Sequence, residues 1–218
     1  MPWFYFKSGM FHVRKGTKEV ALSNVKKLLY SFFVYTIIGE IMYWVGIYTK
    51  MERDFNLTEQ LVASTKCMIV QGSTIGNQPL WFLISLYLTK VVVTFLENQK
   101  IPLIAIIIIS GFIAWISSNV GAYINGVFYI PYLIMSTSIG MFFYGIGTLM
   151  QVIQYKKNVY ILALLTYSCV VILFPSQVDV RLGMLKYGSW IAFMLSSLAG
   201  IIVINNLTKL KILQFPLR

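Results

Sequence analysis

The sequence predicts an all-α, polytopic integral membrane protein, and its composition, its apolar runs and the spacing of its charges all indicate this class. Of the 218 residues, 58% are hydrophobic and 11% are charged, and the mean hydropathy is +0.74. Soluble domains average about 45–50% apolar and about 25% charged residues. We therefore expect a single transmembrane domain over residues 1–218, with the lipid bilayer as its solvent.

Six apolar runs are long enough to cross the hydrocarbon core of a bilayer, which takes about 17–25 residues of helix. The predicted spans are residues 28–48, 79–96, 101–118, 128–150, 159–174 and 189–207. The fifth run, with 16 residues, is short by this rule. A seventh run, residues 2–13, is too short to cross, so we predict an N-terminal half-helix there.

The basic residues indicate the orientation, because segments rich in Lys and Arg resist translocation. Residues 14–27 contain five basic side chains and one acid, Glu19, which places this basic loop on the inner side. Alternating spans then also bring Lys100, Lys156, Lys157 and the basic C-terminal tail inside. The predicted location is the inner (plasma) membrane, in a multi-pass arrangement. The outer segment 49–76 is long enough for an external amphipathic or re-entrant helix over residues 59–70, which would roof a cavity.

Several other classes of protein are disfavoured by the same composition. A net charge of +11 does not indicate a nucleic-acid partner here, because the basic residues lie between apolar runs rather than on one folded surface. Cys67 and Cys169 are the only cysteines and His12 is the only histidine, and no metal-ligand spacing is present. We therefore expect no metal and no bound cofactor.

Two ionisable residues lie near the middle of predicted spans, Glu40 in the first and Lys90 in the second. A charge at that depth costs at least about 2.5–3.5 kcal/mol, so each should have a partner or face water. At about 1.5 Å rise per residue, their depths agree to within the length of a Lys side chain. One interpretation is a Glu40–Lys90 pair that lines a polar pathway. The other is that Lys90 extends to the inner surface while Glu40 is hydrogen-bonded or protonated.

The second span begins with two amides, a proline and an aromatic residue, in the segment 76–83 (GNQPLWFL). Free N–H groups at a helix start can hold an anion or a carbonyl oxygen, so Asn77, Gln78 and Trp81 are candidate substrate-binding residues. The alternative is an ordinary helix entry with an interfacial Trp. Small residues at Ser8–Gly9, between Gly140 and Gly145, and from Ser196 to Gly200 predict close helix packing.

Several segments, in order along the chain, resemble the acyltransferase-3 family of membrane proteins. Residues 1–11 (MPWFYFKSGMF) resemble the family's "MPLFFFISGYFF" stretch and are followed by a basic loop, and residues 79–86 (PLWFLISL) resemble its "PLWFLxxL" helix start. Residues 140–147 resemble its aromatic-and-glycine helix, and residues 178–200 resemble its later "VD…G" loop and helix.

The resemblance implies transfer of an acyl group, often acetyl, from a cytoplasmic thioester such as acetyl-CoA to a hydroxyl of a surface glycan. The family's catalytic histidine belongs to a helix that precedes the first matched stretch, and its C-terminal helices follow the last one. Residue 12 falls at a variable family position, so the role of general base is not carried over to His12 and the catalytic residues stay unknown. We expect the 218-residue chain alone to be inactive.

Two alternatives remain open at this stage. The chain would be a non-catalytic remnant or would complete an active site with another chain, or it would be a small transporter or flippase accessory with Glu40 and Lys90 as its pathway charges. The acceptor sugar, the acyl group and the oligomeric state are not predicted.

Overall fold

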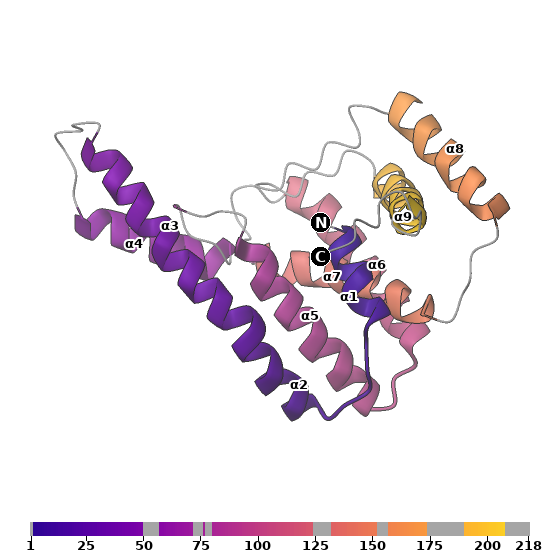
Figure 1. Cartoon of the computed structure of the whole chain (residues 1–218), viewed down its shortest axis with the longest axis horizontal. Helices are drawn as coiled ribbons and strands as arrows, with labels where there is room; N and C mark the ends of the chain where they lie inside the picture. The colour runs from indigo at the N-terminus through magenta and orange to yellow at the C-terminus, as the bar shows by residue number, and fades with distance from the viewer. Residues whose placement is uncertain are drawn as a thin grey trace, which may run out of the picture.

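The computed structural model describes residues 2–49, 57–71, 76, 80–123, 132–151, 157–173 and 190–207. This part of the chain is helical, with short connections and no strand (Figure 1). In chain order its helices are α1 (Pro2–Met10), α2 (Thr17–Asn24), the π-helical turn η1 (Val25–Leu29), α3 (Tyr30–Thr49), α4 (Leu57–Gln71), α5 (Trp81–Asn98), α6 (Leu103–Tyr123), α7 (Tyr132–Leu149), α8 (Lys157–Leu173) and α9 (Trp190–Leu207). The predicted all-α class is confirmed for these residues.

One helix overlaps each of the six predicted spans. These helices are α3, α5, α6, α7, α8 and α9, and they have 17 to 21 residues. Two stretches of the described chain, Thr17–Gly46 and Trp81–Asn98, are long and apolar enough to cross a membrane. The run predicted as a half-helix forms the nine-residue α1, and the run predicted as an external or re-entrant helix forms α4.

The prediction of a basic loop over residues 14–27 is wrong for most of its length. A helix begins at Thr17, after Gly16 in an extended conformation, and continues through α2 and η1 into α3. Lys and Glu are good helix formers, and no Gly or Pro interrupts residues 17–38. The π-helical turn at Val25–Leu29 absorbs one extra residue where the basic part of this helix meets its apolar part.

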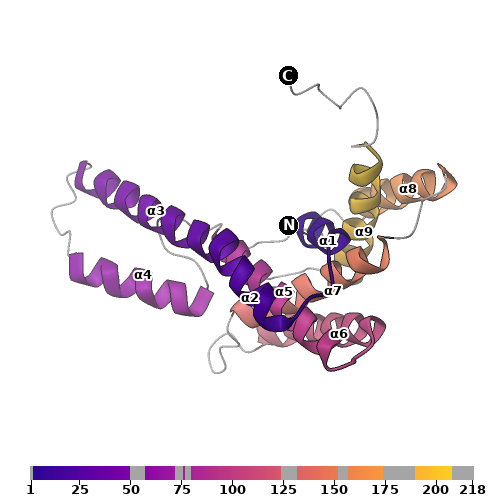
Figure 2. The same ribbon diagram turned by 60° about the horizontal axis from the view of Figure 1, so that its bottom comes forward.

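Helix α7 lies at the centre of the packing. Helices α1, α5 and α6 pack against it, while α8 pairs with α9 and α9 also contacts α1. Helix α2 and the turn η1 pack on α5. The outer part of α3 and much of α4 extend away from this group, as Figure 2 shows, although α4 also contacts α7.

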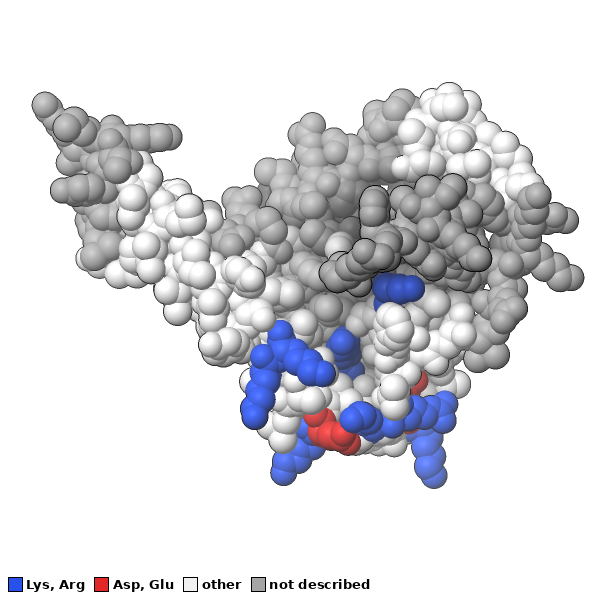
Figure 3. Space-filling view, viewed as in Figure 1, with Lys and Arg blue, Asp and Glu red and all other residues white. Residues whose placement is uncertain are grey.

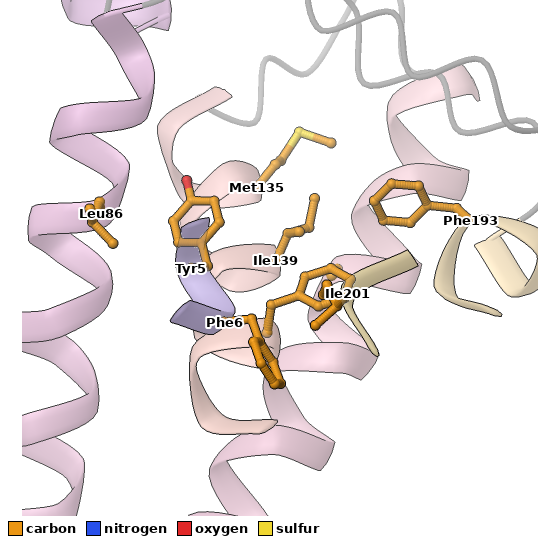
Figure 4. Close-up of a cluster of buried hydrophobic side chains, with 9 residues drawn as sticks. Tyr5, Phe6, Leu86, Met135, Ile139, Phe193 and Ile201 are labelled. Atoms are coloured by element: carbon orange, nitrogen blue, oxygen red, sulfur yellow. The ribbon is translucent and has the colours of Figure 1, made fainter. Parts of the chain in front are cut away.

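The main core lies where α1 enters the group of helices (Figure 4). Tyr5 and Phe6 of α1 are 2% and 1% exposed, and they pack in one cluster with Leu86 of α5 and Ile139 and Phe143 of α7. Burial of a large apolar side chain contributes about 1.5–3 kcal/mol in water. A nine-residue helix that is marginal by itself is therefore held in place by its side chains.

Glycines allow α1 and α7 to touch through their backbones. A Cβ atom added at Gly9 would meet the carbonyl group of Tyr144, and one added at Gly147 would meet the carbonyl group of Phe6. A Cβ at Gly140 would meet the ring of Tyr5. The predicted close packing at Gly9 and Gly140 is thus confirmed, and it sets the position of the residues that follow α1.

Candidate functional site

One side chain at the end of α5 and one just after α7 hold the connection between α1 and α2. The Asn98 amide donates to the hydroxyl of Thr17 at 2.8 Å and to the carbonyl of Lys15 at 3.4 Å. The Gln151 amide donates to the carbonyls of Gly9 at 3.0 Å and His12 at 2.9 Å. The connection is therefore fixed against the ends of two other helices.

His12 lies at the centre of this arrangement, with both ring nitrogens occupied. Its Nε2 is 2.7 Å from Oε2 of Glu97, and its Nδ1 is 2.8 Å from the hydroxyl oxygen of Tyr144. The His12 and Glu97 side chains are 5% and 11% exposed. The donor and acceptor roles of the two ring nitrogens depend on the tautomer. Both ring nitrogens thus contact protein groups, and His12 joins the residues after α1 to α5 and α7.

A cavity of about 450 Å³ lies beside this buried pair. Its lining residues come from the α1–α2 connection and from the turn between α5 and α6: Arg14, Lys15, Glu97, Asn98, Lys100, Ile101, Pro102 and Leu103. Figure 3 shows that Lys and Arg side chains of the described residues gather at this end of the molecule, around α2 and the end of α5. The cavity has three basic side chains and one carboxylate, so its electrostatic character is positive.

The turn after α5 places a lysine where glycine is usual. The N–H of Ile101 donates to the carbonyl of Leu96 and the N–H of Lys100 to that of Glu97, which is the Schellman pattern of a helix end. Lys100 occupies the left-handed position of this motif, with φ at 62°. A non-glycine residue there costs on the order of 1–3 kcal/mol. The cavity is thus lined by a basic residue that is held in a strained backbone conformation.

The predicted Glu40–Lys90 pair does not form. Glu40 is 8% exposed, and its carboxylate accepts hydrogen bonds from the Ser64 hydroxyl and from the N–H of Gly76, both at 2.9 Å. Among the described residues the ion pairs are His12–Glu97 and Lys15–Glu19. Equal depth in the bilayer does not fix which face of a helix a residue occupies, and α4 supplies the polar partner instead. The interpretation of Glu40 as a hydrogen-bonded residue fits this structure.

A second, smaller cavity of about 240 Å³ lies between α3 and α4 next to Glu40. Its lining is largely apolar, with Ile37 and Leu61 among its residues. Gly76 approaches the backbone of Gly39 and Glu40 so closely that a Cβ would meet it. The backbone N–H of Gly76, ahead of the second predicted span, therefore donates to a carboxyl group of the chain itself.

The candidate binding residues of that segment are placed only in part. Trp81 is buried, at 9% exposed, and its ring contacts Phe82 edge-on at 6.3 Å between centroids. Asn77 and Gln78 lie outside the described residues. Trp81 thus has a packing role in this structure, and the proposed binding role of the two amides stays a prediction.

The residues of this candidate site that the sequence analysis did not identify are Glu97, Asn98 and Tyr144. The run Glu97-Asn98-Gln99-Lys100 is a polar end to an apolar span on the predicted inner side, and this is the signal that would have found two of them. Nothing in the sequence indicated Tyr144, because an aromatic residue within an apolar helix is typical of a core.

The fold and the site define a helical protein with apolar helices and a basic cavity at one end. We compared the chain with models of protein families, with curated proteins and with solved structures, and no match was found in any of these comparisons.

Proposed function

We propose that this protein is a membrane acyltransferase that moves acyl groups, in the first place acetyl, from a cytoplasmic thioester to carbohydrate, as its resemblance to the acyltransferase-3 family implies. One observation carries the proposal. Three of the segments on which the resemblance rests are far apart in the sequence, yet they lie together in one core formed by α1, α5 and α7.

The contacts between these segments are specific. The Tyr5 hydroxyl of the first segment donates to the Ser85 hydroxyl of the second at 2.7 Å, and both groups are buried. The rings of Tyr5 and Phe82 meet edge-on with centroids 5.0 Å apart. Gly140, which begins the third segment, leaves room for the ring of Tyr5. Residues quoted for the resemblance are therefore one another's packing partners, as expected of segments that act as a unit.

The proposal includes a six-span topology in the inner membrane, with the basic end of the molecule in the cytoplasm. Large apolar side chains stay exposed on the outer faces of several helices, including Met42 of α3 at 70%, Ile108 of α6 at 65% and Ile172 of α8 at 75%. Continuous exposed apolar surface is unusual for a soluble monomer. It is what the lipid-facing side of a membrane helix requires.

In the proposed reaction the oxygen of a glycan hydroxyl attacks the thioester carbonyl. The carbon–sulfur bond breaks, the acetyl group ends on the sugar oxygen, and the hydroxyl proton ends on the released thiol. Polarisation of the carbonyl and removal of the proton are the steps that a protein accelerates. Within the described residues no side chain is assigned as the general base, and another chain that completes the site is part of the proposal.

The test uses membrane vesicles from the cells that make the chain natively, together with the chain that completes its site, and acetyl-CoA labelled in its acetyl group. Inside-out vesicles should incorporate label into carbohydrate as an alkali-labile ester, and right-side-out vesicles should not. Vesicles with a Gly147→Ala chain, in which α1 cannot pack on α7, are the matched control and should lose incorporation. Equal labelling with and without the chain would contradict the proposal.

The transporter alternative rested on Glu40 and Lys90 as a pathway pair. Glu40 is bound instead by Ser64 and Gly76, so no observation favours that alternative.

A further inference from the structure

We propose that the basic cavity between the α1–α2 connection and the α5–α6 turn binds the phosphate groups of a soluble ligand from the cytoplasm. Its assignment to the nucleotide end of a thioester donor rests on the proposed function. The phosphate site itself follows from the cavity, its charges and its backbone, and stands without that function.

The charges in the cavity are not neutralised by one another. Lys15 pairs with Glu19, and the one carboxylate of the lining, Glu97, is engaged by His12. Arg14 and Lys100 form no ion pair with any described residue, and both are exposed. Arg can bind a phosphate through two parallel N–H groups, while Lys binds it as a point charge. Two free cations on one concave surface therefore suit a polyanion such as a pyrophosphate.

The backbone at Lys100 supports the same conclusion by a separate route. The left-handed position of this helix end would be unstrained with glycine, and the chain carries lysine there. Strained positions persist where the surrounding structure holds them, and they concentrate at functional sites. The turn places Lys100 in the lining of the cavity. Binding of a ligand by its ammonium group would explain why a lysine is kept at this strained position.

The surroundings of the cavity make it a built site rather than a patch of surface charge. Asn98 and the buried His12–Glu97 pair fix its two walls relative to each other, and Pro102 stiffens the α5–α6 turn. Its volume of about 450 Å³ lies within the range of about 300–1,000 Å³ that small-molecule sites occupy. A preformed site loses little conformational freedom when it binds its ligand.

The experiment uses the purified full chain in nanodiscs of phosphatidylcholine, titrated with inorganic pyrophosphate, coenzyme A or dihexanoyl phosphatidylglycerol. We expect pyrophosphate and coenzyme A to bind, coenzyme A more tightly. Lys100→Gly should weaken both on the order of tenfold, because a charge-assisted contact is lost. The same variant should melt at a higher temperature than the wild type, because glycine relieves the strain. Lys18→Gln, which removes a charge from the same end but outside the cavity, is the control and should leave binding unchanged.

The possible outcomes distinguish the phosphate site from its assignment to the thioester donor. Wild-type affinity in Lys100→Gly, or an equal loss in Lys18→Gln, would overturn the phosphate site. Tighter binding of phosphatidylglycerol than of coenzyme A would overturn the soluble ligand in favour of a lipid headgroup. If pyrophosphate binds at Lys100 and coenzyme A binds no more tightly, the site stands and the donor assignment, with the proposed function behind it, fails.

Discussion

The contact between α1 and α7 leaves no room for a single methyl group. A Cβ at Gly9 or at Gly147 would fall on the backbone of the facing helix, at Tyr144 or Phe6 respectively. Backbone atoms cannot turn aside as the end of a flexible side chain can. Alanine at either position must therefore push α1 away from α7.

The separation would also stretch hydrogen bonds that cross this contact. The carbonyl of Gly9 accepts from the Thr148 hydroxyl at 3.2 Å and from the Gln151 amide at 3.0 Å, and the Tyr144 hydroxyl meets His12 at 2.8 Å. Overpacking costs about 1–3 kcal/mol, and each hydrogen bond contributes about 1 kcal/mol. The higher helix propensity of alanine offsets about 1 kcal/mol of this loss in stability. We expect Gly147→Ala to lower the free energy of unfolding by about 3 kcal/mol.

The assay is reversible unfolding of the purified chain in mixed micelles, followed by circular dichroism. Gly46→Ala is the matched control, because a Cβ at Gly46 meets nothing within 4 Å, and it should be neutral or stabilising. If Gly147→Ala proved as stable as Gly46→Ala, the backbone contact between α1 and α7 would be refuted.

Two further predictions concern the buried carboxylates. Glu97→Ala should lower the free energy of unfolding by about 3 kcal/mol, because it strips His12 of its partner in a nearly buried pair; Glu19→Ala, in an exposed pair, should cost less than about 1 kcal/mol. Equal costs in thermal melts would contradict this reading. Gly76→Ala and Glu40→Gln should be strongly non-additive, since the Gly76 N–H donates to the Glu40 carboxylate. A double-mutant cycle that closes to within about 0.5 kcal/mol would show that they do not interact.

The helices were predictable from the sequence because each apolar run is longer than a strand and long enough for four or more helical turns. Helices α5 and α9 begin within two residues of the starts predicted for their spans. The start of α2 was missed because the basic segment contains both helix formers and charges, and charge was interpreted as a loop. The helix formers in this segment were a signal for a helix, and the sequence analysis gave more weight to the charges.

The candidate site was less predictable because it depends on which helix faces which. Counting residues gave Glu40 and Lys90 similar depths, but it carried no information on rotation about the helix axis. His12 and Glu97 are 85 residues apart, and their contact depends on the packing of α1 on α7, which a Cβ atom at Gly9 would obstruct. The left-handed backbone at Lys100 could not be foreseen either, since lysine rarely adopts it.

The most direct test of the account asks whether the basic cavity faces the cytoplasm and is covered by the acyl donor. Cys67 and Cys169 are first replaced by serine, and Pro102→Cys then places a thiol at the exposed edge of the cavity while keeping its three basic side chains. Labelling with an impermeant maleimide is measured in intact cells and in inside-out vesicles, with Glu59→Cys as the outer control.

We predict that Pro102→Cys stays unlabelled in intact cells, reacts in inside-out vesicles, and reacts more slowly there when acetyl-CoA is present. Glu59→Cys should react in intact cells. Labelling of Pro102→Cys from outside, or labelling in inside-out vesicles that acetyl-CoA does not slow, would contradict the account.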